Sequence, residues 1–202
     1  MKSDLSFKFV VAAVLTGVLL AFAAPAKARG AAEIDRTGTF STSSGASGSF
    51  VSKKIRSKGS STTQATITNA QGGVTTRQSQ ATWSQGSGTF SGTQTNATGA
   101  TSSWQGTSSK VAPGVIDTQG TLTTAKGTTD TFTATKTEVS PGTWDKSEVI
   151  TTASGKTIDR TVDTSVAGGA GTRQSTTTLP SGNVVTGSAS FTQTVTPLPA
   201  SS

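Results

Sequence analysis

The chain has 202 residues, which suits one domain of ordinary size, and a formal net charge of +7. It contains no cysteine, histidine or tyrosine, which excludes disulfide bonds, thiolate metal sites and imidazole-based catalysis. Hydrophobic residues make up 31% and charged residues 13%, and a chain poor in both is not typical of a disordered polyelectrolyte. We therefore expect an ordered, non-enzymatic protein without a metal or another cofactor.

The two ends of the chain differ in composition from its middle. Residues 1–28 resemble a secretory signal peptide: Lys2 and Lys8 precede or flank an apolar run, and Ala26-Lys27-Ala28 fits a cleavage site. A retained membrane anchor is the alternative. We expect residues 29–35 to be a linker and residues 197–202 a disordered tail, because Pro197 and Pro199 do not continue a strand. The mature chain would be secreted or at the cell surface, or else periplasmic, with no membrane span.

A short turn recurs along the middle of the chain. One copy is Ala125-Lys126-Gly127, which suggests a three-residue hairpin loop closed by a left-handed glycine. The equivalent turn glycines follow one another at steps of 27 or 28 residues: Gly45, Gly72, Gly99, Gly127, Gly155 and Gly182. This period predicts six hairpin repeats over residues 36–196.

The segments between turns are rich in Thr, Val, Ile and Phe and often alternate, which is the signal of a β-strand. Each repeat has a second turn about halfway, so we expect an all-β fold of about twelve antiparallel strands in a meander. The sheet would close into a barrel, fold into a sandwich or stack on other chains. A parallel β-solenoid with one repeat per coil is the alternative.

The loop Ala125-Lys126-Gly127 also fixes a register. It sets Gly120 against Phe132, and the same rule sets Gly92 against Trp104 and Gly38 against Phe50. A ring laid across a glycine covers its bare backbone, so the recurrence favours antiparallel hairpins over the solenoid. At the same level, Glu148 would face Arg160.

Alternation divides the side chains between two faces of the sheet. One face holds the rings, the aliphatic residues and the small residues, and the other is mostly Thr and Ser. Neither face is apolar enough for the lipid-facing band of an outer-membrane barrel, so we do not expect one.

Two groups of residues are candidate binding sites. Equivalent positions of successive hairpins carry Phe50, Arg77, Trp104, Phe132 and Arg160, which would form either a sugar-binding platform or a core-facing row. The densest basic run contributes Lys53, Lys54, Arg56 and Lys58, which would bind anionic polysaccharide of the cell envelope or protect a sheet edge from aggregation. We do not expect nucleic acid as a partner. The Thr-rich face could bind glycan or ice, although acidic residues interrupt it.

Tandem strand–turn–strand units rich in Ser, Thr, Gly and Gln, with an export signal and no cysteine, resemble secreted bacterial matrix proteins of the curli type in style. The spaced Gln/Asn ladder of curlin repeats is not present. The chain also resembles bacterial Thr/Gly-rich hairpin-repeat proteins that carry no assigned function. The hypothesis from the sequence is an exported structural protein of the cell surface or matrix that self-assembles. The alternative is a secreted polysaccharide- or ice-binding module.

Overall fold

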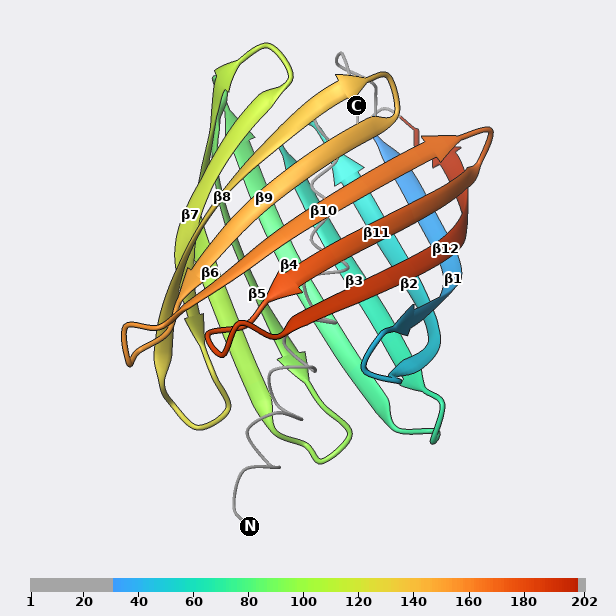
Figure 1. Ribbon diagram of the computed structural model, residues 1–202. Coiled ribbons are helices and arrows are strands. Elements are labelled where there is room, and N and C mark those ends of the chain that lie inside the picture. Colours follow the sequence, from blue (N-terminus) through green and yellow to red (C-terminus); the bar gives the residue numbers. More distant parts are fainter. Residues whose placement is uncertain (1–30, 200–202) are drawn as a thin grey trace.

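The computed structural model describes residues 31–199, and these form a closed, all-antiparallel barrel (Figure 1). Its strands follow one another in chain order around the wall, so the predicted meander of hairpins is confirmed and the parallel solenoid is wrong. The strands are β1 (Ala32–Thr42), β2 (Ser47–Ser57), β3 (Ser60–Asn69), β4 (Val74–Ser84), β5 (Ser87–Thr95), β6 (Thr101–Ala112), β7 (Val115–Thr123), β8 (Thr129–Ser140), β9 (Thr143–Thr151), β10 (Thr157–Ala167), β11 (Ala170–Thr178) and β12 (Val184–Pro197).

The ends of the barrel domain differ from the expected boundaries. Strand β1 begins at Ala32, inside the segment expected to be a linker, and Ala32 pairs with Pro197 of β12. Leu198 N donates a hydrogen bond to Ala31 O at 2.8 Å, so ladder-like bonding continues into the expected tail. Closure explains the difference: the first and last strands need these residues to pair with each other. The expected signal peptide lies outside the described residues.

The hairpin turns have the predicted chemistry. Gly45, Gly72, Gly99, Gly127 and their equivalents adopt φ between 77° and 85°, which an L side chain rarely adopts. At Gly127 the amide N donates to Thr124 O at 2.9 Å, and Thr124 N donates to Thr128 O at 2.8 Å. These bonds close the loop that fixes the register of each hairpin.

The predicted register is also present. Gly120 faces Phe132, Gly92 faces Trp104 and Gly38 faces Phe50. A Cβ at Gly120 would lie 2.7 Å from Phe132 Cζ and 2.3 Å from Gln105 O, so the ring lies directly on the glycine. At Gly92 and Gly120 the opposite ring therefore requires a glycine, as the pairing pattern suggested, whereas a Cβ at Gly38 would meet Ser190 and Phe191 and not Phe50.

Strand β1 pairs with β12 along its whole length, from Ala32 opposite Pro197 to Thr42 opposite Gly187. Closure leaves every strand of the described chain with two neighbours, so no open edge is available as a template for another copy. The expectation of assembly through free strand edges is wrong for this reason. The basic run does not protect a sheet edge either, because its strand, β2, lies between β1 and β3.

The ring-bearing face turns inward. Within residues 31–199, the aromatic side chains all fall at inward positions of their strands: Phe40, Phe50, Trp83, Phe90, Trp104, Phe132, Trp144 and Phe191. One buried cluster contains Phe40, Phe50, Ile67 and Ala189, and a second contains Ala81, Phe90, Trp104 and Phe132. The outward face carries mainly Thr and Ser, as predicted, with isolated exposed valines such as Val51 and Val149.

The barrel has two rims. The chain-end rim, uppermost in Figure 1, carries both ends of the barrel and the turns that contain Gly59, Gly86, Gly114, Gly142 and Gly169. The far rim carries the turns with Gly45, Gly72, Gly99, Gly127, Gly155 and Gly182. The inward side chains between these rims face the lumen.

Candidate anion site in the barrel lumen

Basic side chains from opposite walls of the barrel converge in the lumen. We call them the basic cluster: Arg36, Lys54, Arg77, Lys136, Lys146, Arg160 and Arg173. They come from β1, β2, β4, β8, β9, β10 and β11, and strand alternation turns each of them to the same side as the rings. Their charges act on one another across the lumen, since Arg173 lies in the fields of Arg160, Arg77 and Arg36.

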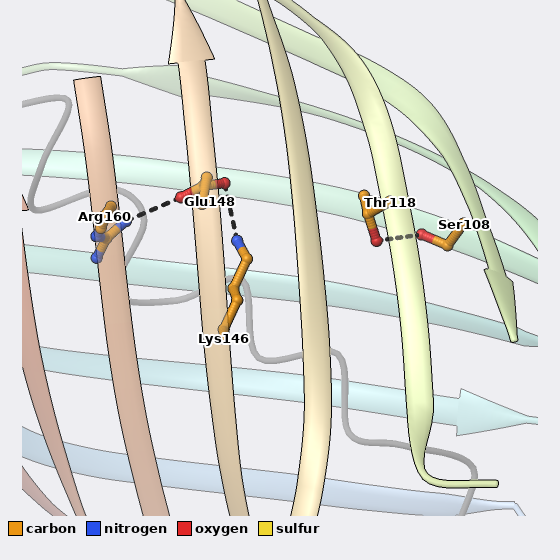
Figure 2. A network of polar contacts seen from close by, with 5 residues as sticks. All are labelled: Ser108, Thr118, Lys146, Glu148 and Arg160. Atoms are coloured by element: carbon orange, nitrogen blue, oxygen red, sulfur yellow. Dashed lines mark hydrogen bonds and ion pairs between the residues drawn. The ribbon is translucent and has the colours of Figure 1, made fainter. Parts of the chain in front are cut away.

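One carboxylate stands within this cluster. Glu148 Oε1 accepts a hydrogen bond from Lys146 Nζ at 2.8 Å, and its Oε2 lies 3.6 Å from Arg160 Nη1 (Figure 2). The β9–β10 ladder sets Glu148 directly opposite Arg160, as the sequence predicted. Among residues 31–199, Glu148 is the one buried carboxylate, so it balances only a small part of the positive charge around it.

Burial and mutual repulsion act on the pKa values of the cluster. Burial, followed by the charge of Arg160, lowers the pKa of Arg77 to about 9. Burial, with the charges of Arg36 and Arg56, lowers the pKa of Lys54 to about 8. Burial opposes ionisation of Glu148, yet Lys146 and Arg160 together hold its pKa below the usual range. The lumen is therefore a strongly electropositive environment in which the charged groups are poorly solvated.

Several polar atoms in the lumen have no hydrogen-bond partner among the described residues. Arg160 is 4% exposed, and both its Nε and its Nη2 are buried without an acceptor. The indole nitrogens of Trp104 and Trp144 are likewise buried donors without an acceptor. Buried donors without acceptors are rare in native proteins, and each calls for a physical explanation.

The predicted row of equivalent residues is real, but it lines the inside of the barrel. Phe50, Arg77, Trp104, Phe132 and Arg160 each stand three residues after the start of an even-numbered strand, close to the far rim, and all five are buried. The Arg77 guanidinium lies 4.2 Å from the centroid of the Trp104 ring. The row is thus a core-facing ring of side chains, and its interpretation as an exposed sugar platform is wrong.

The basic run of β2 does not act as one patch. Lys53 points outward and forms an ion pair with Glu33 at 2.8 Å, whereas Lys54 and Arg56 point into the barrel. Lys58 is exposed in the turn that follows. Alternation along a strand divides neighbouring lysines between the two faces, so a dense run in sequence is not a dense patch in space.

Four members of the basic cluster were not predicted as site residues: Arg36, Lys136, Lys146 and Arg173. Their signal was present in the alternation. Lys136 shares the face of Phe132, and Lys146 shares the face of Glu148. Counting basic residues by face, instead of along the chain, would have found them.

Residues 31–199 were also compared with what a metal site and a membrane-spanning helix require. Within residues 31–199 no group of three or more acidic side chains gathers where it could hold a metal ion. No helix in this part of the chain is long and apolar enough to cross a membrane.

Comparisons with known proteins bear on the fold. No family model and no curated protein matches the sequence. Two solved structures of the KdgM porin, one in complex with disordered oligogalacturonate, match with a TM-score of 0.56 and 7% sequence identity, over 79% of this chain and 97% of theirs. A chain from a study of in-meso crystallization of membrane proteins matches with a TM-score of 0.54 and 4% identity, over 80% of this chain and 83% of its own. The barrel is therefore similar in fold to a porin.

These findings overturn the function expected from the sequence. A closed porin-like barrel has no edge for matrix assembly, and its rings are inside, away from any surface polymer. The Thr face curves around the outside of the barrel and is not a flat array for glycan or ice. Both the self-assembling matrix protein and the binding module that uses these surfaces are wrong. The fold is also one that porins use to cross membranes, so the strand pattern no longer supports the expectation of no membrane span.

Proposed function

We propose that this protein is a porin-like barrel of the cell envelope that takes up small anions into its lumen. The observation that carries the proposal is the charge imbalance there, with the basic cluster gathered around the single buried carboxylate of residues 31–199. Leaving buried charges uncompensated costs several kcal/mol per ion, roughly, after relaxation. An anion among these side chains reduces that cost.

The donors suit a multivalent oxyanion. Guanidinium groups present several N–H donors in a planar fork that matches carboxylate or phosphate oxygens. Arg160 offers two such donors that the described residues do not use. Glu148 holds Arg160 on one side and leaves those donors directed elsewhere. We therefore expect a di- or tricarboxylate, or a similar multivalent anion, to bind more tightly than chloride.

The likeness to KdgM supports an acidic solute. One of the matching porin structures is a complex with oligogalacturonate, an acidic oligosaccharide. At 7% identity this likeness concerns the fold, so the charge of the cargo is argued from the basic cluster of this chain. The basic side chains of β2, β8, β9 and β11 stand three or four residues from the chain-end rim, and we assign entry to that rim.

The test is a calorimetric titration of the purified protein with citrate, which is trivalent near neutral pH. We expect saturable binding that weakens with added salt. Arg160→Gln should lower the affinity by about tenfold or more, since a hydrogen bond to a charged group contributes about 1.5–3 kcal/mol. Lys58→Gln, which removes an exposed turn lysine, should bind as the wild type does.

Folding of each variant is checked by circular dichroism. If Arg160→Gln does not fold, Lys54→Gln removes a cation from another strand of the cluster and serves in its place. Equal citrate affinity in the wild type and in a folded cluster variant would overturn the proposal, as would no binding by the wild type.

A further inference from the structure

Two buried polar side chains on neighbouring strands of the inner wall each have an atom without a hydrogen-bond partner among residues 31–199. Gln94 on β5 is 8% exposed and its Oε1 has no donor, whereas Trp104 on β6 is 7% exposed and its Nε1 has no acceptor. Gln94 lies opposite Ser102 in the β5–β6 ladder, two residues before Trp104. The two side chains are therefore diagonal neighbours on the inner face, within reach of each other. We call Gln94 and Trp104 the neutral pair.

The neutral pair adjoins the anion site. Gln94 stands directly opposite Arg77 in the β4–β5 ladder, and the Arg77 guanidinium lies 4.2 Å from the centroid of the Trp104 ring. The charges of Arg160 and Glu148 act on Arg77 across the lumen. An anion held among the arginines would therefore present its uncharged part to the neutral pair.

The neutral pair discriminates between chemical groups, because it offers one acceptor, Gln94 Oε1, and one donor, Trp104 Nε1. A carboxylate only accepts hydrogen bonds, so it would set its oxygen against the Gln94 oxygen and leave that atom without a donor. An ammonium group only donates, and the charge of Arg77 repels it. An alcohol hydroxyl both donates and accepts, and it is the smallest organic group that satisfies both atoms.

We propose that the neutral pair is a hydroxyl subsite, which makes the lumen selective for hydroxylated carboxylate anions over anions that carry carboxylates alone. This inference rests on the proposed anion uptake and names the class of solute within it. Arg160 holds a carboxylate of the solute, and the solute hydroxyl donates to Gln94 Oε1 and accepts from Trp104 Nε1. A solute without the hydroxyl leaves both buried atoms unpaired, and a polar site rejects an analogue for that reason.

The test compares two anions that differ by one hydroxyl. Citrate and tricarballylate carry the same carboxylates on the same carbon chain, and only citrate has a hydroxyl on its central carbon. Each is titrated into the purified protein by calorimetry at a mildly alkaline pH, where both are trivalent. We expect citrate to bind about tenfold more tightly, because tricarballylate makes neither hydrogen bond to the neutral pair.

Three variants complete the design. Gln94→Met removes the acceptor and keeps an unbranched side chain of similar length, so it should lower the affinity for citrate and leave that for tricarballylate unchanged. Trp104→Phe removes the donor and keeps a ring beside Arg77, so it should also reduce the preference for citrate. Gln105→Met removes an exposed glutamine next to Trp104 in the chain and should keep the wild-type preference.

The wild-type comparison gives an answer even if circular dichroism shows that a variant does not fold. Equal affinity of the wild type for the two anions would overturn the hydroxyl subsite and leave the anion uptake intact. A preference for citrate that persists in folded Gln94→Met and Trp104→Phe would do the same. Arg160→Gln, in contrast, should weaken both anions alike, and no binding of either anion by the wild type would overturn both proposals.

Discussion

Glu148 stands directly opposite Arg160 in the β9–β10 ladder, with Oε2 3.6 Å from Nη1, and both side chains are buried. The pair was foreseen from the hairpin register, but its setting was not. It lies inside a closed barrel among further arginines and lysines. There the carboxylate compensates buried positive charge, which at the surface water would solvate.

Glu148→Gln should therefore be strongly destabilising. Removing the carboxylate leaves Lys146 and Arg160 as buried charges without compensation, and breaking such a pair typically costs about 3–5 kcal/mol. Urea unfolding at neutral pH measures the change. Added sulfate should restore part of the lost stability, since it supplies the missing negative charge.

The control for this prediction is Glu33→Gln. Glu33 pairs with Lys53 on the outward face, where an exposed ion pair contributes about 0.2–1 kcal/mol. If the two variants lose equal stability, the buried carboxylate has no special role in holding the cluster together.

The contact between Gly120 and Phe132 predicts a second effect. Gly120→Ala should destabilise the barrel by about 1–3 kcal/mol, because a Cβ at this position overlaps the ring and the backbone oxygen of Gln105. Gly187→Ala is the matched control. Its Cβ would meet only the flexible hydroxyl of Ser175 closely, at 2.9 Å, and we expect a much smaller loss in thermal unfolding. A larger loss at Gly187 than at Gly120 would contradict the ring-on-glycine account.

The lowered pKa of Lys136 predicts how stability depends on pH. In the unfolded chain this lysine binds its proton up to about pH 10, whereas in the folded barrel it releases the proton near pH 7. The unfolded state therefore binds more protons between these values, and stability should rise with pH across that window. Each unit of lowered pKa corresponds to about 1.4 kcal/mol as an upper bound for a partly exposed group.

Lys136→Met should reduce this rise and raise the stability at neutral pH, while Lys54 and Arg77, whose pKa values are also lowered, maintain the remaining part. The measurement is urea unfolding at several pH values from about 6.5 to 9.5, which span the titration of the folded lysine. Lys126→Met, at an exposed turn, should keep the wild-type dependence. An unchanged slope in Lys136→Met would show that this lysine is ordinary in the folded state.

The sequence predicted the fold well because turn spacing and strand alternation are local signals. The loop at Gly127 was sufficient to set Gly120 against Phe132, and all of the corresponding hairpins follow the same rule. Closure could not be derived in this way. The pairing of Ala32 with Pro197 joins the two ends of the barrel, and no local pattern distinguishes it from two free edges.

The candidate site was predicted only in part, for a related reason. Arg77 and Arg160 were identified by their repeat positions, but which face was inside depended on closure. Lys136 and Arg173 stand at the repeat positions of Lys54 and Lys146, but only the positions of the rings were compared between repeats, so the search along the chain passed over them. Their convergence is a property of opposite walls of the barrel, which only the three-dimensional structure brings together.

The most direct test of the central claim is a crystal structure of the protein with selenate, a divalent oxyanion whose selenium is located by anomalous scattering. The account predicts a selenate in the lumen within hydrogen-bonding distance of Arg160 Nη2 or Nε, with other members of the basic cluster around it. Selenate bound only to the outer wall or the turns, with the Arg160 donors satisfied by water, would contradict the account.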